Sequence, residues 1–268
     1  MHLTRHHGLG NVFLIGMLDQ IPGDAPGLAR QLCDPTTGVS ADGLIIGTPA
    51  AIPSEGPSSF AVFNRDGSRA ELSGNGLCCF GQAVGRATGI TDLEFTVATD
   101  VGHRHILVSG SPTDPEVSVI VDMGYPGPGP EVDDLIIDLG GIPHGRVATV
   151  NIGNPHLLVE VSDPASIDLA AVGPALEAQF APEGCNVHLV ELLAPSRVLL
   201  RSWERGVGLT EACGTGACAA AYLAHAWENG GATVEVVMSG GRASVSVGDT
   251  LLLSSSATFV DDHEIDRG

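Results

Sequence analysis

One short pattern occurs twice in the chain. Glu71-Leu-Ser-Gly-Asn-Gly-Leu-Cys78 and Glu211-Ala-Cys-Gly-Thr-Gly-Ala-Cys218 both read Glu-x-Ser/Cys-Gly-x-Gly-x-Cys, and a helical stretch follows each copy. Ser73 and Cys213 are the equivalent positions, 140 residues apart. This separation is far longer than the repeat unit of a solenoid. The duplication therefore predicts two similar α/β domains.

Strand-like segments fill most of both halves. They are short, rich in β-branched residues and bounded by Gly, Pro, Asp or Ser, as strands are. The predicted strands are 12–15, 60–63, 93–98, 106–108 and 117–122, then 147–152, 157–161, 187–193, 198–203, 233–238 and 243–247. Helical patterns are fewer, at 79–86, 167–180 and 219–227. The Pro- and Gly-rich stretch 124–130 indicates a domain boundary region.

The Gly-x-Gly in each copy indicates a ligand site. Without side chains, these residues let backbone N–H groups approach a ligand closely at a helix start. Two such helix starts facing each other would hold one anion, such as a carboxylate. Two ordinary Gly-rich turns are the alternative interpretation, which the duplication disfavours. Neither copy is a dinucleotide-binding fingerprint, because the third glycine is missing.

Charge and composition exclude several functions. The net charge of −20 disfavours binding to nucleic acid or to anionic membranes. All twelve basic residues are Arg, so the chain has no Lys for a pyridoxal-phosphate Schiff base or a P-loop. No apolar run is long enough to span a membrane, and the first residues lack the apolar core of a signal peptide. We therefore expect a cytoplasmic protein that needs no cofactor.

The remaining Cys and His residues do not form a recognised metal motif. In the cytoplasm the six cysteines are expected to be reduced. Most of them are expected to be buried core residues, as free cysteines usually are: Cys33, Cys78, Cys79, Cys185 and Cys218. The clustered histidines lack a Cys or carboxylate at a known ligand spacing and are expected at the surface: His2, His6, His7, His103 and His105. We expect no metal site.

Several motifs in order resemble diaminopimelate epimerase over nearly the whole chain. They are His7-Gly-Leu-Gly-Asn11, Phe63-Asn-Arg-Asp-Gly-Ser68, Gly153-Asn-Pro-His156, Glu204-Arg-Gly-Val-Gly208 and Ala212-Cys-Gly-Thr-Gly-Ala-Cys218. The resemblance implies an α/β (mixed α+β) fold of two pseudo-symmetric domains. Each domain would be a curled mixed sheet around a central helix, with the active site in the cleft between them. The expected domains are 1–119 with a C-terminal strand 258–268, and 120–257.

The same resemblance assigns the site residues. It places the two acid/base groups that flank the substrate's α-carbon at Ser73 and Cys213, assisted by His156 and Glu204 respectively. It places substrate-binding side chains at Asn11, Asn64, Asn154, Asn186 and Arg205, and carboxylate-binding backbone at Gly74, Asn75, Gly76, Gly214 and Thr215. The expected partner is a small-molecule substrate, an amino acid. The sequence leaves a homodimer open.

The expected chemistry follows from the weak acidity of an amino acid's α-proton. Without a cofactor, the site itself must stabilise the carbanion electrostatically. Helix N-termini favour negative charge, so we expect them to stabilise the carboxylate and to lower the pKa of the Cys213 thiol. A Cys with a tuned pKa can serve as the general base.

Ser73 departs from the family pattern, which has Cys at this position. A hydroxyl is a poor base even beside His156. Val12, Gly43, Cys78 and Leu209 also stand where the family pattern has Asp, Gln, Arg and Glu.

Four interpretations therefore stay open. They are an epimerase of a diaminopimelate-like amino acid, a racemase of another amino acid, a one-base lyase or dehydratase, and an impaired Cys-to-Ser form of the epimerase. A binding protein that keeps the fold without the chemistry is disfavoured by Cys213, Glu204 and His156.

Overall fold

The computed structural model describes residues 1–48, 58–228 and 231–265. The chain divides into two compact units, Met1–Asp122 with Ser254–Gly268, and Met123–Leu253. Each unit contains one central helix that follows one copy of the repeated pattern. The predicted fold of two pseudo-symmetric α/β domains with curled mixed sheets is confirmed.

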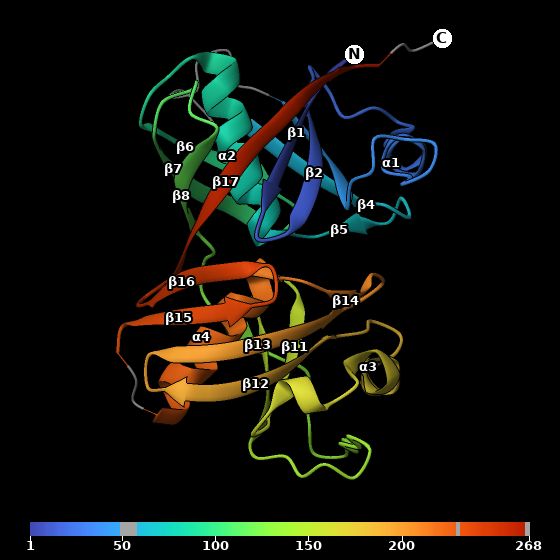
Figure 1. Ribbon diagram of the computed structural model, residues 1–268, viewed down its shortest axis with the longest axis vertical. Helices are drawn as coiled ribbons and strands as arrows, with labels where there is room; N and C mark the ends of the chain where they lie inside the picture. Colours follow the sequence, from blue (N-terminus) through green and yellow to red (C-terminus); the bar gives the residue numbers. More distant parts are fainter. Residues whose placement is uncertain (49–57, 229–230, 266–268) are drawn as a thin grey trace. The chain divides into compact units, whose positions relative to one another are not determined.

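The strands of the first unit close into a ring. In order of pairing they are β1 (His2–Gly8), β2 (Asn11–Met17), β3 (Gly43–Thr48), β4 (Ser58–Asn64), β6 (Leu93–Thr99), β7 (Gly102–Ser109), β8 (Glu116–Asp122) and β17 (Leu251–Glu264), which pairs back with β1. The β2–β3 and β4–β6 pairs are parallel. The short β5 (Arg69–Ala70) extends beside β4. Figure 1 shows this curled sheet in blue, green and red.

Helix α2 (Gly74–Thr88) forms the centre of this unit. Its residues 74–85 are all buried, and it contacts β1, β2, β3, β7 and β8. The strands around it alternate between buried and exposed positions, as in β8, where Val117, Val119 and Val121 are buried. This period of two gives the sheet one apolar face, which packs on the helix. Helix α1 (Ala25–Leu32) covers the other face of β3 and β4 through Ala25, Ala29 and Leu32.

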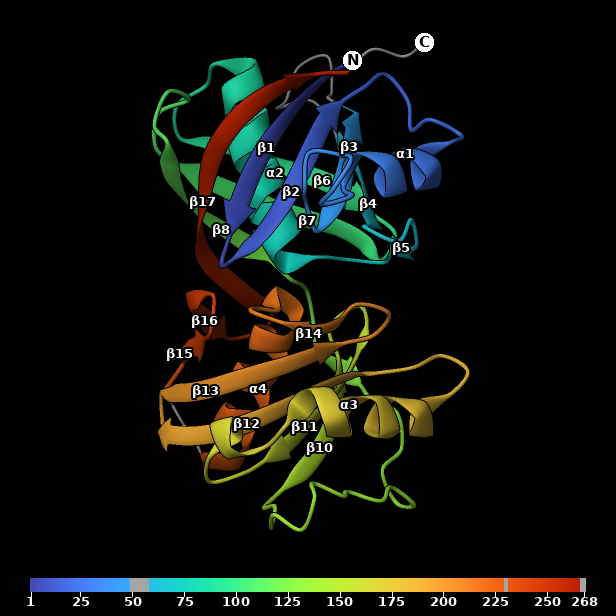
Figure 2. The same cartoon turned by 45° about the vertical axis from the view of Figure 1, so that its right-hand side comes forward.

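The second unit repeats this plan. Its strands β10 (Val147–Asn151), β11 (Pro155–Glu160), β12 (Asn186–Ala194), β13 (Arg197–Glu204), β15 (Thr233–Met238) and β16 (Gly241–Val247) pair in this order, with β11–β12 and β13–β15 parallel. Two short strands, β9 (Gly127–Pro128) and β14 (Gly208–Thr210), pair with β10 and β13. Helix α4 (Gly214–Glu228) packs on the six longer strands, β10 to β13, β15 and β16. Helix α3 (Leu169–Glu177) packs on β12 and β13 (Figure 2).

The strand registers give a residue-by-residue correspondence between the units. Phe13 lies opposite Gly43 across β2–β3, as His156 lies opposite Asn186 across β11–β12. On the neighbouring pairs, Ile45 lies opposite Val62, as His188 lies opposite Ser202. Phe13, Ile45 and Val62 in the first unit therefore correspond to His156, His188 and Ser202 in the second.

Most predicted elements are confirmed, and the differences are local. The helix predicted at 167–180 is α3, preceded by the 3-10 turn η1 (Pro164–Ser166) and continued by η2 (Ala178–Phe180). The C-terminal strand begins at Leu251 and not at residue 258. The last residues of the range 258–268 lie outside the described part. None of the helices formed by the described residues has the length and apolar character that a membrane crossing requires.

Candidate active site

Ser73 and Cys213 occupy the same position at the starts of the two central helices. The Oγ of Ser73 accepts a hydrogen bond of 3.0 Å from the backbone N–H of Gly76. The Sγ of Cys213 accepts the equivalent bond, 3.3 Å long, from the N–H of Gly216. Such side chains cap helices because the first turn leaves its N–H groups without intrahelical acceptors. The duplicated motif thus builds one local geometry twice, with oxygen in one copy and sulfur in the other.

The Cys213 thiol is held between donors and a carboxylate. Its side chain is buried, and Thr215 Oγ1 lies 3.4 Å from the sulfur. Glu204, at the end of β13, lies close enough to accept a hydrogen bond from the thiol. The Glu204 carboxylate also accepts a bond of 2.7 Å from Thr210 Oγ1. A proton can therefore pass between the sulfur of Cys213 and the carboxylate of Glu204.

The expectation that the helix start lowers the Cys213 pKa is wrong. Burial raises the pKa of this thiol well above its usual value, and the charge of Glu204 raises it further. The bonds from Thr215 and Gly216 act in the opposite direction and are outweighed. Desolvation penalises the thiolate more strongly than the helix N-terminus stabilises it. Cys213 is therefore a neutral thiol in the free protein.

The charge of Glu204 gives a testable effect on the reactivity of the thiol. Glu204→Gln removes a negative charge beside Cys213, so the pKa of the thiol should fall. Only the thiolate reacts with iodoacetamide, so labelling of Cys213 at fixed pH should become severalfold faster. The measurement is the pH dependence of labelling, followed by peptide mapping. Glu235→Gln, on β15 of the same unit, is the control. An unchanged pH profile would mean that the carboxylate does not act on the thiol.

His156 is buried, and both its ring nitrogens are engaged within the second unit. Its Nδ1 lies 2.8 Å from Nε2 of His188, and its Nε2 lies 2.8 Å from Oδ1 of Asn154. Burial lowers the pKa of His156 well below its usual value, and His188 and Arg205 lower it further. The ring is therefore neutral and already hydrogen-bonded on both sides. It is a poor candidate for a free base beside Ser73.

His188 and Ser202 were missed by the sequence analysis. His188 Nδ1 lies 2.9 Å from Oγ of Ser202 on the neighbouring strand, and both side chains are buried. The signal available in the sequence was a histidine at a position that the corresponding first-half strand fills with Ile45. Reading that signal required the pairing register.

The same residues form a possible metal cluster. One ligand atom from each of His156, His188 and Cys213 lies within 4.8 Å of the others. All four imidazole nitrogens, however, already have hydrogen-bond partners among the described residues. An ion would have to break these bonds, so we interpret the cluster as a hydrogen-bond network.

Two further predicted binding residues of the second unit, Asn186 and Arg205, are joined by a hydrogen bond. Its Oδ1 accepts a bond of 3.0 Å from the backbone N–H of Arg205, and its Nδ2 donates to the carbonyl of Pro155 at 3.1 Å. Arg205 also donates from Nη1 to the carbonyl of Glu183 at 2.8 Å. The buried amide of Asn186 is thus positioned to orient Arg205. Gly214 and Thr215 lie in the first turn of α4.

Most of the predicted binding residues of the first unit lie in or contact the first turn of α2, whereas Asn64 lies at the end of β4. Asn75 donates from Nδ2 to Oδ1 of Asn11 at 2.6 Å. Its own Oδ1 is buried and has no hydrogen-bond partner among the described residues. Asn64 donates to Ser68 Oγ at 3.0 Å. Gly74 and Gly76 are buried in the first turn.

Packing explains one departure from the family pattern. A Cβ at Gly43 would lie 2.9 Å from the carbonyl oxygen of Phe63, which is too close, so a side chain here would require a backbone shift; the Phe13 ring, 3.4 Å away, would be in ordinary van der Waals contact. Cys78 is fully buried, which raises its pKa to about 12. Leu209 is exposed on β14.

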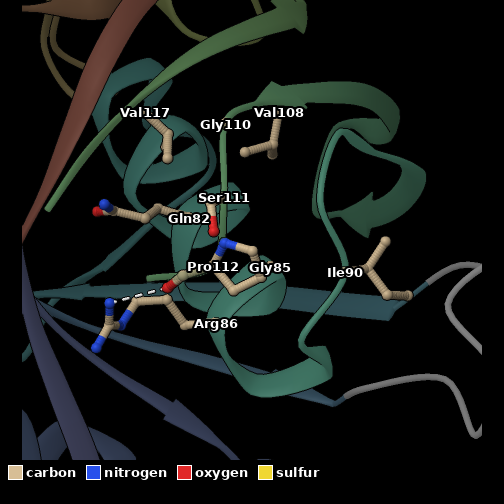
Figure 3. Close-up of a pocket in the computed structure, with 9 residues that line it drawn as sticks. All are labelled: Gln82, Gly85, Arg86, Ile90, Val108, Gly110, Ser111, Pro112 and Val117. Carbon is tan, nitrogen blue, oxygen red and sulfur yellow. Dashed lines mark hydrogen bonds between the residues drawn. The ribbon is translucent and has the colours of Figure 1, made fainter. Parts of the chain in front are cut away.

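A small pocket in the first unit has a different character. Gln82, Arg86, Ile90, Val108, Ser111 and Pro112 are among its lining residues (Figure 3). The polar groups at its edge are already used, since Gln82 Nε2 donates to the carbonyl of Pro115 and Arg86 Nη1 donates to that of Pro112, both at 3.0 Å. It contains none of the predicted site residues.

Comparison with solved structures identifies the class of fold. A hydroxyproline epimerase from Agrobacterium vitis matches with a TM-score of 0.73 at 16% identity, covering 98% of this chain and 91% of the other. A probable proline racemase from Agrobacterium radiobacter K84 matches with a TM-score of 0.73 at 16% identity, covering 99% and 92%. The fold is that of the racemases and epimerases with two pseudo-symmetric domains.

Sequence comparison is more specific. The diaminopimelate epimerase family model matches residues 3–127 and 148–252. Diaminopimelate epimerases of Moorella thermoacetica and Desulforudis audaxviator are 38% and 39% identical, each with 82% of both chains covered. The chain belongs to the diaminopimelate epimerase family, and it is an isomerase of the amino-acid epimerase type.

Proposed function

We propose that this enzyme inverts the α-carbon of diaminopimelate, or of a closely similar diamino diacid, without a cofactor. The observation that carries the proposal is the Cys213 thiol, held between the carboxylate of Glu204 and the first turn of α4. The family relatives support the substrate, since their names assign them this reaction.

In the proposed reaction, Cys213 first becomes a thiolate. The positive α-ammonium of a bound amino acid lowers the pKa of a nearby thiol, since an opposite charge favours the ionised form. The thiol proton passes to Glu204, which already accepts its hydrogen bond. The sulfur then takes the α-proton, and the electron pair of the broken C–H bond delocalises into the substrate carboxylate. Backbone N–H groups of the helix first turns stabilise that charge.

Inversion requires a proton from the opposite face of the same carbon. We propose that Ser73 supplies it, directly or through water, and that its hydroxyl makes this the slower half of the reaction. A hydroxyl can donate a proton to a carbanion, but it removes one from carbon poorly. The reaction is therefore expected to be faster from one enantiomer than from the other.

A one-base lyase is the second candidate, because Ser73 leaves only one thiol. Incubation in heavy water with the stereoisomers of diaminopimelate, and with amino acids bearing a β-leaving group, separates the candidates. Deuterium at the α-carbon with inversion supports the epimerase. A keto acid supports the lyase. Absence of exchange with every substrate would contradict both. Light scattering during the same work tests the homodimer that the sequence leaves open.

Arg205 is expected to bind the distal carboxylate of the substrate. Arg can donate two parallel hydrogen bonds to a carboxylate, whereas Lys offers a point charge. Arg205→Lys should raise the KM for diaminopimelate by about tenfold to a hundredfold, the value of one charged hydrogen bond, with a smaller change in kcat. Steady-state kinetics measures this split. Arg201→Lys, on β13 just before Arg205, is the control. An unchanged KM would place the distal carboxylate elsewhere.

A further inference from the structure

A chain of buried polar side chains crosses three strands of the second unit. Ser202 Oγ on β13 lies 2.9 Å from His188 Nδ1 on β12. His188 Nε2 lies 2.8 Å from His156 Nδ1 on β11, and His156 Nε2 lies 2.8 Å from Asn154 Oδ1. Ser202, His188 and His156 are buried, whereas Asn154 is partly exposed. The chain therefore ends at a single amide that a ligand can reach.

The fold itself does not require these polar groups. By the strand registers, the corresponding positions of the first unit are Val62, Ile45 and Phe13, all buried and apolar. The same architecture thus forms with an ordinary apolar layer under its central helix. Burying imidazoles is costly unless their hydrogen bonds are satisfied. At these three positions the first unit avoids this cost and the second bears it, which indicates a function.

The helix fixes the place of the His188 ring. Gly216, in the first turn of α4, packs directly on this ring, and a Cβ there would lie 2.5 Å from Cε1 of His188. The same glycine donates its N–H to Cys213. The ring is therefore held against the segment that carries the thiol, and its orientation follows from packing and not only from hydrogen bonds.

The hydrogen bonds of this series all run in one direction, from Ser202 toward Asn154. Burial lowers the pKa of His188 to about 3 and that of His156 well below its usual value, so both rings are neutral and carry one N–H each. Oδ1 of Asn154 can only accept, so Nε2 of His156 donates to it. Nδ1 of His156 must then accept from Nε2 of His188. Nδ1 of His188 in turn accepts from the hydroxyl of Ser202.

We propose that His188 is a positioning residue which, with Ser202, stabilises the tautomer of His156 that donates to Oδ1 of Asn154, and thereby holds the Asn154 amide with its NH2 toward the ligand. An NH2 group donates to a carboxylate, whereas a carbonyl oxygen at the same place would repel it. The chain would thus set the preference of this subsite for an anionic group. Only this last step, the carboxylate at Asn154, rests on the proposed function.

Histidine NMR tests the tautomers directly. In 15N-labelled wild-type protein, the ring spectra of His156 and His188 should both show the proton on Nε2. In His188→Leu and in Ser202→Ala the preference at His156 should weaken or reverse. His188→Gln should retain it, because the side-chain NH2 of Gln can donate where Nε2 of His188 does. A proton on Nδ1 of His156 in the wild type, or an unchanged tautomer in both disrupting variants, overturns the proposal.

Kinetics with diaminopimelate tests the consequence. His188→Leu and Ser202→Ala should raise KM about tenfold or more, the value of one hydrogen bond to a charged group, with a smaller effect on kcat. His188→Gln should restore most of the affinity. A loss in kcat alone, or no rescue by Gln, would mean that His188 acts only through stability.

The matched control is His6→Leu in the first unit. His6 was expected at the surface, but it is equally buried. Its pKa is lowered to about 4, and its ring nitrogens bond to Gln82 and Thr4. Its replacement should destabilise the protein without changing KM. If His188→Leu does not fold, Ser202→Ala serves as the test, because it removes only a hydroxyl group. If the wild type does not act on diaminopimelate, the proposed function fails, while the NMR result still decides the tautomer.

Discussion

Replacing Cys213 with Ala is expected to abolish exchange of the substrate's α-proton. The side chain is the only thiol at the start of either central helix, since the other copy has Ser73. Loss of a general acid/base group typically costs about 10²–10⁴-fold in rate. We expect a loss at the upper end of this range, because His156 is neutral and hydrogen-bonded on both ring nitrogens and cannot replace the thiol. The measurement is deuterium incorporation from heavy water, by NMR, with each stereoisomer.

Cys218→Ala is the matched control for this variant. Cys218 lies on the same helix, is fully buried and likewise forms no disulfide. Removing its sulfur deletes a similar volume and should lower stability without changing the exchange rate. Exchange that survives in Cys213→Ala and is lost in Cys218→Ala would place the chemistry at another thiol and contradict the proposed site.

The duplicated motif was enough to predict the architecture. Because Ser73 and Cys213 mark equivalent helix starts, the positions of α2 and α4 and the two-domain plan followed directly. The sequence analysis missed α1, which contains Pro26 and Gly27 and therefore has low intrinsic helix propensity. It also missed β3, a continuous buried run that has no alternation to indicate a strand. Both elements form because of tertiary packing.

The C-terminal strand illustrates the same limit. Ser254, Ser255 and Ser256 interrupt the apolar pattern, so the sequence indicated a strand only beyond them. In the structure they lie within β17, which pairs with β1 and β8. Pairing of β17 with neighbouring strands carries this polar segment into the sheet, although its own side chains give no such signal.

The motif was enough to predict the helix start that carries Cys213, but not the protonation state of its thiol. Motifs identified Cys213, Glu204 and His156, yet the direction of the Cys213 pKa shift was wrong. A sequence shows that a thiol stands at a helix start, but not how completely other segments exclude water from it. His188 was missed for a related reason, since its importance depends on cross-strand partners that only the register reveals.

Comparison of the two helix starts also indicates the surroundings that a thiol at position 73 would have. A Cys there should fit, because Gly216 N accommodates the Cys213 sulfur at 3.3 Å in the corresponding turn. Its surroundings would differ, however. Ser73 is partly exposed, while Cys213 is buried. Phe63 corresponds to Trp203 by register, so the next residue, Asn64, stands where the second unit has Glu204. With less burial and no carboxylate, the pKa of this thiol should be raised less than that of Cys213.

Ser73→Cys is therefore expected to increase the rate of inversion. A thiol can ionise in the working pH range, whereas the serine hydroxyl cannot. If this step limits inversion, the gain should approach the usual contribution of a general acid/base group, about 10²–10⁴-fold. In the wild type, one enantiomer should exchange its α-proton quickly through Cys213 and the other slowly. In the variant, the two rates should become similar. The measurements are exchange of each enantiomer in heavy water and the rate of inversion by chiral chromatography.

The control for this variant is Ser73→Ala, which removes the hydroxyl and the cap without adding a base. Loss of the cap should cost about 1 kcal/mol of stability, and inversion should fall while exchange through Cys213 continues. Equal exchange of both enantiomers by the wild type would contradict the asymmetry, because a second base would then already act on the Ser73 side. If Ser73→Cys gains no inversion with any diamino diacid, the residues that depart from the family pattern have redirected the site. Gly43, where a Cβ would lie too close to the Phe63 carbonyl, would be the first of these to examine.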